Sequence, residues 1–196
     1  MKLDNIYYFF DDIYTKKFCD DVVKTCLKKA DSQATVFGAD DGKELLKKRN
    51  SNVVWIGEAW IKKQINNAVY AANGKANWNF NIDYLETPQF TKYGKKQYYH
   101  WHTDAGNINT DINPFTHGKI RKLSSVTLLN DSNEYEGGDF ELGIQWADKV
   151  SIIKIKQLNK KGSCVVFPSH LWHRVTPVKK GIRYSLVSWH LGRPFI

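Results

Sequence analysis

The segment His100-Trp101-His102-Thr103-Asp104 carries imidazole and carboxylate side chains two positions apart. It lies in a run of β-forming residues, and side chains two apart on a strand share a face, so His102 and Asp104 stand about 7 Å apart along the strand and can reach one ion. These two ligands, with a second imidazole from elsewhere, form the facial triad that binds Fe(II) and leaves further coordination positions open. Under strict alternation His100 shares this face and is a further candidate for contact with metal or substrate.

A second group of candidate residues lies far downstream. Residues 167–177 read FPSHLWHRVTP, and Arg183 follows His173 by ten residues. A guanidinium binds a carboxylate through two parallel hydrogen bonds and stays charged at any useful pH. Residues 177–181 read as the loop of a hairpin, which would carry a metal-binding histidine on one arm and the arginine on the other. His170 and His173 are both candidates for the third metal ligand.

Two amphipathic patterns near the N-terminus predict helices that support these residues. Apolar residues recur at spacings of three and four over residues 15–31, with Thr15 as N-cap, and over residues 58–72, with Gly74 placed to end the helix. From Asn77 onward, short runs rich in Val, Ile, Tyr, Phe and Trp between turn residues predict strands. The expected strands cover residues 78–84, 88–93, 97–103, 122–130, 138–145, 150–157, 163–168, 172–177 and 182–190.

This order of elements predicts a mainly β protein with N-terminal helices and a double-stranded β-helix, or jelly-roll, core. We expect a single domain over residues 1–196, with helical support over about 1–75 and the jelly-roll core over about 77–192. The adjacent glycines within residues 135–139 provide the positive φ that a tight turn needs. Three tryptophans are expected to pack between the helices and the barrel, namely Trp55, Trp60 and Trp78.

The composition bears on the cellular setting and the partners. No segment approaches the roughly 18 apolar residues of a membrane span, and no signal peptide is recognisable. On a helix Cys19 and Cys26 would lie about 10 Å apart, too far for a disulfide, so we expect a soluble, cytoplasmic protein with reduced thiols. The formal charge of +9 admits nucleic acid as a partner, but the basic residues occur in scattered pairs with acidic residues between them, which favours a solvated surface.

Together these motifs resemble the 2-oxoglutarate/Fe(II)-dependent oxygenase superfamily, most closely its prolyl 4-hydroxylase-like and PKHD-type hydroxylases. The resemblance covers roughly residues 50–192. It is carried by the segments Trp55-Ile56, Gln89–Gly94, Lys122–Val126, Tyr135–Gly138, His173–Pro177 and Arg183–Val187. The resemblance implies a dioxygenase that uses Fe(II), 2-oxoglutarate and O2, with ascorbate as a candidate reductant. It also implies a peptide or protein substrate that is hydroxylated at a proline.

At matching positions the resemblance assigns roles to individual residues. His102, Asp104 and His173 match the iron ligands. His173 is preferred to His170 because the ten-residue spacing to Arg183 starts there. Arg183 matches the residue that binds the C5 carboxylate of 2-oxoglutarate.

The resemblance also bears on four residues around the cosubstrate and the pocket. Tyr93 and Tyr99, nine and three residues before the first iron ligand, match two tyrosines of prolyl hydroxylases, and the first of these hydrogen-bonds the cosubstrate. Ser185 shares a face with the arginine by alternation and can replace a polar residue that relatives carry on a neighbouring strand. Trp189 matches an aromatic wall of the pocket.

Other functions stay open from the sequence. Base-demethylating relatives act on nucleic acid, but they usually carry two arginines six apart, whereas Arg183 is followed at that spacing by Trp189. A cupin-type metalloprotein that does not use 2-oxoglutarate fits Gly94, His100 and His102, but the glutamate of the cupin motif is missing. A small-molecule substrate and a binding module without turnover are the remaining alternatives.

Overall fold

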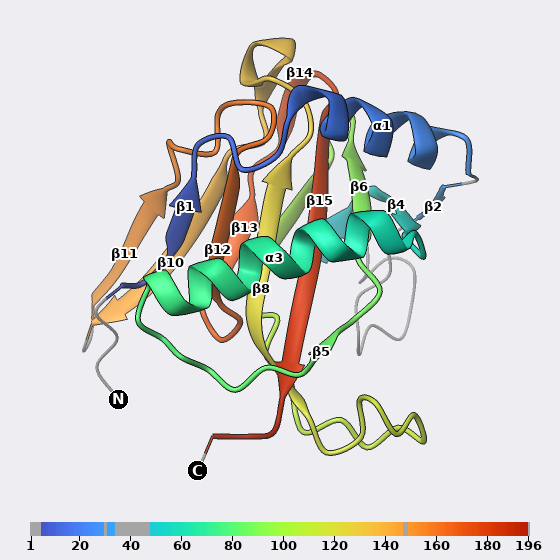
Figure 1. Cartoon of the computed structure of the whole chain (residues 1–196). Helices are drawn as coiled ribbons and strands as arrows, with labels where there is room; N and C mark the ends of the chain where they lie inside the picture. The colour runs from blue at the N-terminus through green and yellow to red at the C-terminus, as the bar shows by residue number, and fades with distance from the viewer. Residues whose placement is uncertain (1–4, 30, 34–47, 147–148, 196) are drawn as a thin grey trace.

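Most of the described chain belongs to two antiparallel sheets. The computed structural model describes residues 5–29, 31–33, 48–146 and 149–195 (Figure 1). The eight-stranded sheet contains β1 (Tyr8–Phe10), β2 (Ser32–Gln33), β4 (Asn52–Trp55), β5 (Tyr84–Leu85), β6 (Gln89–Tyr93), β8 (Ile120–Leu128), β12 (Cys164–Pro168) and β15 (Arg183–Gly192). The five-stranded sheet contains β3 (Arg49–Asn50), β7 (Tyr98–His102), β10 (Phe140–Trp146), β11 (Lys149–Lys154) and β13 (Trp172–Val175). A separate ladder pairs β9 (Tyr135–Gly137), which follows the short 3-10 helix η1 (Ser132–Glu134), with β14 (Val178–Gly181).

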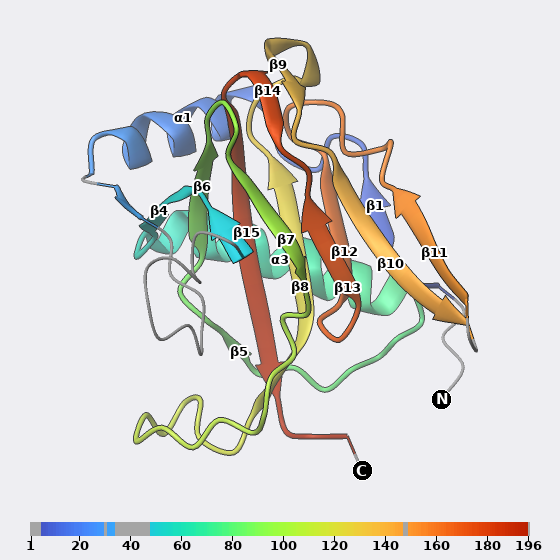
Figure 2. The same cartoon turned by 180° about the vertical axis from the view of Figure 1, so that it is seen from behind.

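The two large sheets face each other across a small apolar cluster. The strand orders are β1-β12-β8-β15-β6-β4-β2, with β5 beside β15, and β11-β10-β13-β7-β3. Figure 2 shows the five-stranded sheet in front of the larger one. The cluster between them takes side chains from both sheets, from the separate ladder and from the loop after β11, namely Tyr93, Val126, Phe140, Leu142, Ile155, Val165, Phe167, Val175 and Val178. The expected mainly β architecture with a double-stranded β-helix is thereby confirmed.

Both expected helices are present, and the end of the second differs from the prediction. In α1 (Lys16–Leu27) the Thr15 side chain caps the helix by accepting a hydrogen bond from the backbone N–H of Phe18 at 3.1 Å. The second helix, α3 (Ala59–Lys75), continues through Gly74, so the prediction that Gly74 ends it is wrong. Asn77, with φ of 58°, takes the left-handed position after the helix that glycine usually fills.

The segment 78–84 is an irregular loop up to Tyr84, where a strand was expected, and its side chains are alternately buried and exposed. The side chain of Asn73 on α3 donates to the carbonyl of Phe80 at 2.8 Å and accepts from its N–H at 2.9 Å. An amide side chain has both a donor and an acceptor, so it replaces the strand partner that this backbone would otherwise need. The apolar residues that suggested a strand are explained by burial, because Trp78 and Phe80 lie in the core.

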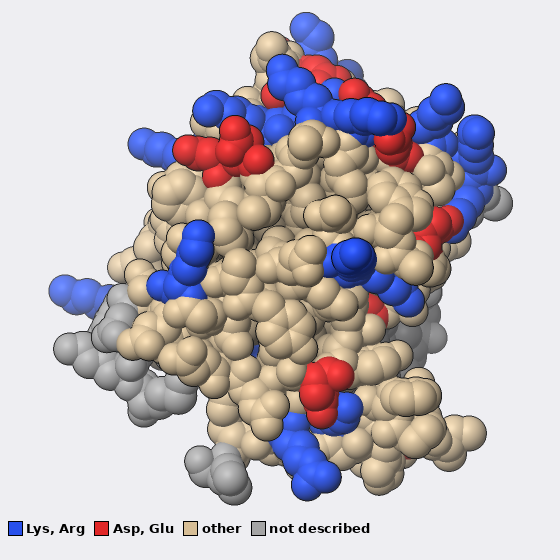
Figure 3. Space-filling model, in the orientation of Figure 1, with Lys and Arg blue, Asp and Glu red and all other residues tan. Residues whose placement is uncertain are grey.

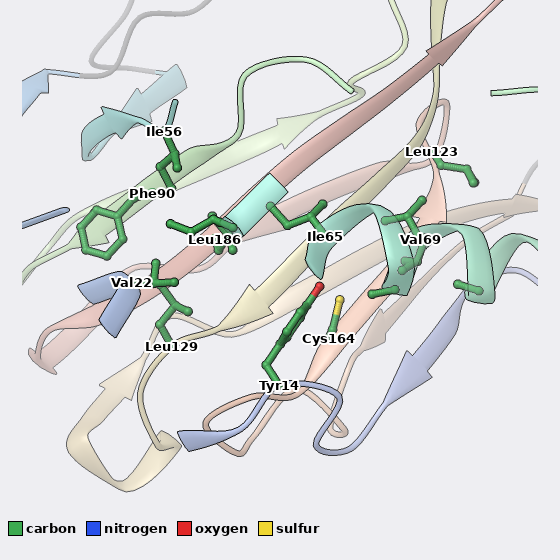
Figure 4. Packing of buried hydrophobic residues seen from close by; sticks show 14 of the residues in the cluster. Tyr14, Val22, Ile56, Ile65, Val69, Phe90, Leu123, Leu129, Cys164 and Leu186 are labelled. Carbon is green, nitrogen blue, oxygen red and sulfur yellow. The ribbon is translucent and has the colours of Figure 1, made fainter. Parts of the chain in front are cut away.

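The larger apolar cluster lies between the helices and the outer face of the eight-stranded sheet (Figure 4). It joins residues of α1 and α3, such as Val22 and Ile65, to Phe90 and Leu186 on the sheet. The cysteines Cys19, Cys26 and Cys164 are all unpaired and buried in this cluster. Their free thiols agree with the expectation that no disulfide links them.

The three tryptophans expected to join helices and barrel have different surroundings. Trp78 is buried beside Phe80, as expected. Trp55 and Trp60 are 50% and 42% exposed, so the prediction is wrong for these two. Alternation explains Trp55, because its neighbour Val54 takes the helix-facing position on β4. Trp60 lies at the start of α3, where it packs edge-on against Phe18 of α1.

The chain does not form the expected hairpin between His173 and Arg183. The two residues lie in different sheets, on β13 and β15, and residues 178–181 form β14, which pairs with β9. The hairpin was expected from a short connection between two strands, but this connection crosses from one sheet to the other. The expected glycine turn is present, since Gly137 and Gly138 have φ of 76° and 63°.

Charged side chains are distributed over the helix-covered face. In Figure 3, Lys and Arg are spread over this face, and Asp and Glu lie among them. Ion pairs such as Lys17 with Asp21 and Lys161 with Asp20 couple neighbours of opposite charge. Within the described ranges, no helix has the length and apolar character that a membrane crossing requires.

Candidate metal centre

The sequence-predicted ligands His102, Asp104 and His173 converge at the end of β7. The strands β7 and β13 pair so that His102 lies opposite His173. The Asp104 carboxylate lies 3.8 Å from Nε2 of His102 and 3.3 Å from Nε2 of His173. The three ligand atoms, one from each residue, all lie within 4.8 Å of one another. Two imidazoles and one carboxylate on one side of a shared point are the donor set of the Fe(II) facial triad.

Backbone carbonyls fix the tautomer of both histidines. Nδ1 of His102 lies 2.7 Å from the carbonyl oxygen of His100, and Nδ1 of His173 lies 2.9 Å from that of Leu171. A carbonyl only accepts, so each Nδ1 carries the proton and each Nε2 presents its lone pair to the shared point. Burial, and next the neighbouring His173, lower the pKa of His102 to about 3, so this ring is neutral.

One serine binds the carboxylate of Asp104, and a second binds that serine and the Asp104 backbone. Ser124 on β8 donates to Oδ2 at 2.7 Å, and its own oxygen lies 2.9 Å from that of Ser169. The backbone N–H of Asp104 donates to the carbonyl of Ser169 at 2.9 Å. Burial alone would raise the pKa of Asp104, but His173 and then His102 hold it below its usual range. The carboxylate is therefore ionised and oriented before any ion binds.

A β-bulge separates His100 from the site. His173 of β13 pairs with His102 of β7, and Val175 of β13 pairs with Tyr99. The pairs are two residues apart on β13 and three apart on β7, so β7 carries one extra residue. The extra residue breaks the alternation, which turns Tyr99 inward with its ring stacked 3.5 Å from that of His102. His100 is exposed and packs against Tyr98, outside the ligand group. The prediction that His100 shares the face of His102 is therefore wrong, and the alternative ligand His170 is also exposed and outside the group.

Arg183 is a buried cation with an open hydrogen-bonding edge. Its side chain is 1% exposed, and Nη1 donates to Ser185 Oγ at 3.0 Å. Nε and Nη2 are buried and have no hydrogen-bond partner among the described residues. These two nitrogens form one edge of the guanidinium, which is the edge that binds a carboxylate through two parallel hydrogen bonds. The arrangement fits a carboxylate ligand that comes from outside the chain.

A tyrosine ring and a glycine border the guanidinium of Arg183. Tyr93 is opposite Arg183 in the β6–β15 ladder, and the guanidinium carbon lies 5.6 Å from the centre of its ring. A Cβ added at Gly138 would lie 3.0 Å from Cδ of Arg183, so the glycine leaves room for the arginine. Tyr93 and Ser185 are therefore both beside the guanidinium, where the sequence placed them.

Trp189 belongs to a cluster that sequence reasoning identified only in part. Its ring is 6% exposed, lies 6.2 Å from that of Trp55, and carries a buried Nε1 without a hydrogen-bond partner among the described residues. Arg121 stacks over the ring at 4.3 Å and donates to Glu86 at 2.7 Å. No pattern in the sequence pointed to Arg121 or Glu86, because the two lie on separate segments.

Ser124 and Arg49 were also missed. Ser124 lies inside a segment that carried the family resemblance, but nothing marked its hydroxyl as a partner of the metal-binding carboxylate. Arg49 is 5% exposed and stacks over Tyr99 at 4.5 Å. A single arginine in the segment between the two helices has no periodic or spacing signal that would reveal this position.

A two-sheet barrel with this triad defines the class of mononuclear non-haem iron proteins. The family model described as "2OG-Fe(II) oxygenase superfamily" matches residues 88–191, and the chain belongs to this superfamily. Fe(II) and 2-oxoglutarate are the cofactors that the family and the triad imply.

Two curated relatives illustrate the similarity in sequence. A PKHD-type hydroxylase of Xylella fastidiosa is 34% identical over 104 residues, which is 52% of this chain and 43% of the relative. A PKHD-type hydroxylase of Pseudoalteromonas atlantica is 27% identical over 130 residues, which is 66% of this chain and 51% of the relative. The chain thus spans about half the length of these relatives.

Solved structures share the fold over nearly the whole chain. A prolyl-4-hydroxylase of Pseudomonas putida has a TM-score of 0.69 at 20% identity, covering 95% of this chain and 93% of that chain. A viral collagen prolyl hydroxylase from Paramecium bursaria Chlorella virus-1, solved with 2-oxoglutarate, has a TM-score of 0.67 at 21% identity, covering 96% and 97%. At such identities the likeness establishes the fold and not the activity.

Proposed function

We propose that this chain is an Fe(II)- and 2-oxoglutarate-dependent dioxygenase that hydroxylates a peptidyl proline. The observation that carries the reaction type is the triad of His102, Asp104 and His173 together with a buried Arg183 whose carboxylate-binding edge is free. The substrate class is supported by the relatives, which are PKHD-type hydroxylases, and by the prolyl hydroxylases that share the fold.

The protein's own groups hold the cofactors and keep water away. His102, Asp104 and His173 would hold Fe(II), and Arg183 would hold the far carboxylate of 2-oxoglutarate, assisted by Ser185 and Tyr93. Together with O2 these cofactors supply an oxidant strong enough to hydroxylate an unactivated C–H bond, as the cosubstrate is decarboxylated. Apolar rings exclude water on one side, because Phe140 and Phe167 lie 5.8 and 4.8 Å from the ring of His173.

The cluster around Trp189 provides a surface for the substrate in this proposal. Trp55 is half exposed beside Trp189, so the two indoles can pack against a proline ring. Arg121 and Glu86 satisfy each other's charge at the edge of this surface, which suits a neutral substrate segment.

The test is succinate formation from 2-oxoglutarate by protein reconstituted anaerobically with Fe(II) and then exposed to O2. The reaction is run with and without proline-rich peptides, and with and without ascorbate. We expect turnover that rises with a peptide and a gain of 16 Da on that peptide, consistent with hydroxylation. The matched peptide with alanine in place of proline should give neither change.

Asp104→Ala is the control for the metal centre, and it should abolish the peptide-dependent turnover. Asp83→Ala, which removes an exposed partner of Lys119, should leave turnover unchanged. Turnover stimulated by single-stranded DNA or by a free amino acid, but by no peptide, would contradict the substrate assignment. Bound Fe(II) without any 2-oxoglutarate turnover would contradict the dioxygenase assignment and favour a cupin-type or binding role.

A further inference from the structure

Among the described arginines, two side chains are more than nine-tenths buried, Arg183 and Arg49. The first has a role in the proposed function, and the second has none so far. Arg49 is 5% exposed, and no carboxylate forms an ion pair with it in the described part of the chain. Burying a guanidinium without a counter-charge is costly, and an apolar side chain of similar volume would fill the space at lower cost. The cation therefore needs a further explanation.

Arg49 connects the two sheets beside the metal centre. Its backbone belongs to β3, the edge strand of the five-stranded sheet, where it pairs with Tyr99 of β7. Its Nη2 donates to Oε1 of Gln89 at 2.6 Å, and Gln89 begins β6 of the eight-stranded sheet. Its Nε donates to Ser51 at 2.9 Å. These two hydrogen bonds fix the plane of the guanidinium, because both lie in that plane.

The same plane lies against the residue that packs on a metal ligand. The guanidinium carbon of Arg49 lies 4.5 Å from the centre of the Tyr99 ring. The Tyr99 ring lies 3.5 Å from that of His102, with 14° between the planes. A continuous contact therefore runs from the sheet-to-sheet bridge to the imidazole. The hydrogen bond from Nδ1 fixes one edge of that imidazole, and the stacked phenol limits its tilt.

We propose that Arg49 is a positioning residue for the metal centre. Through its contact with the Tyr99 ring, Arg49 sets the plane of the His102 imidazole. The proposal rests on the metal-binding part of the proposed function and not on the identity of the substrate. Groups that orient a ligand from behind it typically change metal affinity by 10- to 100-fold when they are removed. A planar guanidinium can bond to two acceptors and stack on a ring at once, and neither lysine nor an aliphatic side chain combines the two.

The chain offers a matched control for this arginine. Arg174 lies 4.6 Å over the ring of Trp101, the residue immediately before His102, and donates to Glu141. Trp101 of β7 lies beside Trp172 and Ile152 on the outer face of the five-stranded sheet, and Arg174 of β13 stacks on it there. Tyr99 of β7 and Arg49 of β3 instead lie on the side of His102. Arg174→Met thus removes a stacked arginine next to the same ligand, but outside the site.

The experiment titrates the whole chain with Co(II) and records the visible ligand-field spectrum, with thermal unfolding of the metal-free protein as a check on folding. We expect Arg49→Met to bind Co(II) about tenfold more weakly and with a changed spectrum. Arg49→Lys keeps the charge without the plane and should change both in the same direction. Arg174→Met should match the wild type. Wild-type affinity and spectrum in a folded Arg49→Met protein would overturn the proposal.

A double substitution tests whether the effect passes through Tyr99. Tyr99→Leu should weaken Co(II) binding, Tyr99→Phe should keep the affinity because the ring remains, and Arg49→Met should add nothing to Tyr99→Leu. Additive losses would show that the arginine acts by another route and would also overturn the proposal. If Arg49→Met does not fold, the Arg49→Lys and Tyr99 variants decide the matter. Failure to find a hydroxylated peptide would contradict the proposed substrate but would leave these metal-binding results intact. The substrate and the role of Arg49 are therefore tested separately.

Discussion

The two faces of the eight-stranded sheet border different kinds of interior. On the helix side, Leu186 of β15 packs in a large apolar cluster that contains the free cysteines. On the other side, the neighbouring Ser185 and Arg183 lie beside the smaller cluster, next to Tyr93, and two nitrogens of the arginine have no partner among the described residues. One strand therefore serves stability with one set of alternate residues and ligand binding with the other. What distinguishes the functional side is a buried cation whose two free donors, among the described residues, form a carboxylate-binding edge.

Replacement of Arg183 by Met should produce the largest contrast between binding and stability. Loss of a buried charge-assisted pair should weaken 2-oxoglutarate binding by about 2–5 kcal/mol. Removal of an unpaired buried cation should at the same time raise the unfolding free energy of the ligand-free protein, by about 1–4 kcal/mol in comparable cases. Calorimetric titration of 2-oxoglutarate with Mn(II) in place of iron, and chemical denaturation without ligand, measure the two effects. A variant that lost both affinity and stability would show that Arg183 also stabilises the ligand-free fold, against the contrast between the two faces.

Leu186→Ala should act in the opposite way. Leu186 is 1% exposed, so its truncation leaves a cavity in the large cluster and should lower the unfolding free energy by about 3 kcal/mol. Denaturant unfolding measures this loss. The affinity for 2-oxoglutarate, measured where the variant is folded, should stay at the wild-type value. A fall in affinity equal to that of Arg183→Met would show that the two faces are not independent.

His190 gives the helix side a pH dependence of its own. Nε2 of the ring donates to Oδ1 of Asn66 on α3 at 2.9 Å, and burial lowers the pKa of His190 to about 4. The unfolded chain takes up a proton near pH 6.5 and the folded chain only near pH 4, so the unfolding free energy should be full above pH 6.5 and fall towards pH 4. The loss is about 3 kcal/mol at most. Denaturation at several pH values should show a weaker slope in His190→Gln, while the exposed His117→Gln keeps the wild-type slope.

Ser185→Ala should have the smallest effect, and it can be compared directly with the substitution of its neighbour Leu186 on the opposite face. The hydroxyl accepts one hydrogen bond from Arg183, so its loss should weaken 2-oxoglutarate binding by about 1 kcal/mol. The unfolding free energy should change less than it does in the adjacent Leu186→Ala. The same titration and denaturation experiments serve both variants. A larger loss of stability than of affinity would assign Ser185 a structural role instead.

The sequence contained the metal site because its information is local. A His-x-Asp pair, and a histidine ten residues before an arginine, are spacings along the chain that the family resemblance could match. Alternation along β15 correctly placed Ser185 beside Arg183. What failed depended on pairing between segments. The bulge that turns His100 outward arises from the register of β7 against β13, and the link between His173 and Arg183 crosses between sheets. Likewise, the side chain of Asn73 replaces a strand partner, which no periodicity could reveal.

The burial of the three cysteines has a consequence for self-damage. Burial raises the pKa of Cys19, Cys26 and Cys164 to about 12, so at neutral pH they are thiols and not the thiolates that oxidants attack. They also lie in the cluster on the helix side of the eight-stranded sheet, opposite the metal centre. Under the proposed function, an oxidant generated at the metal would form beside the Tyr99 ring, which stacks on His102, and away from the three thiols.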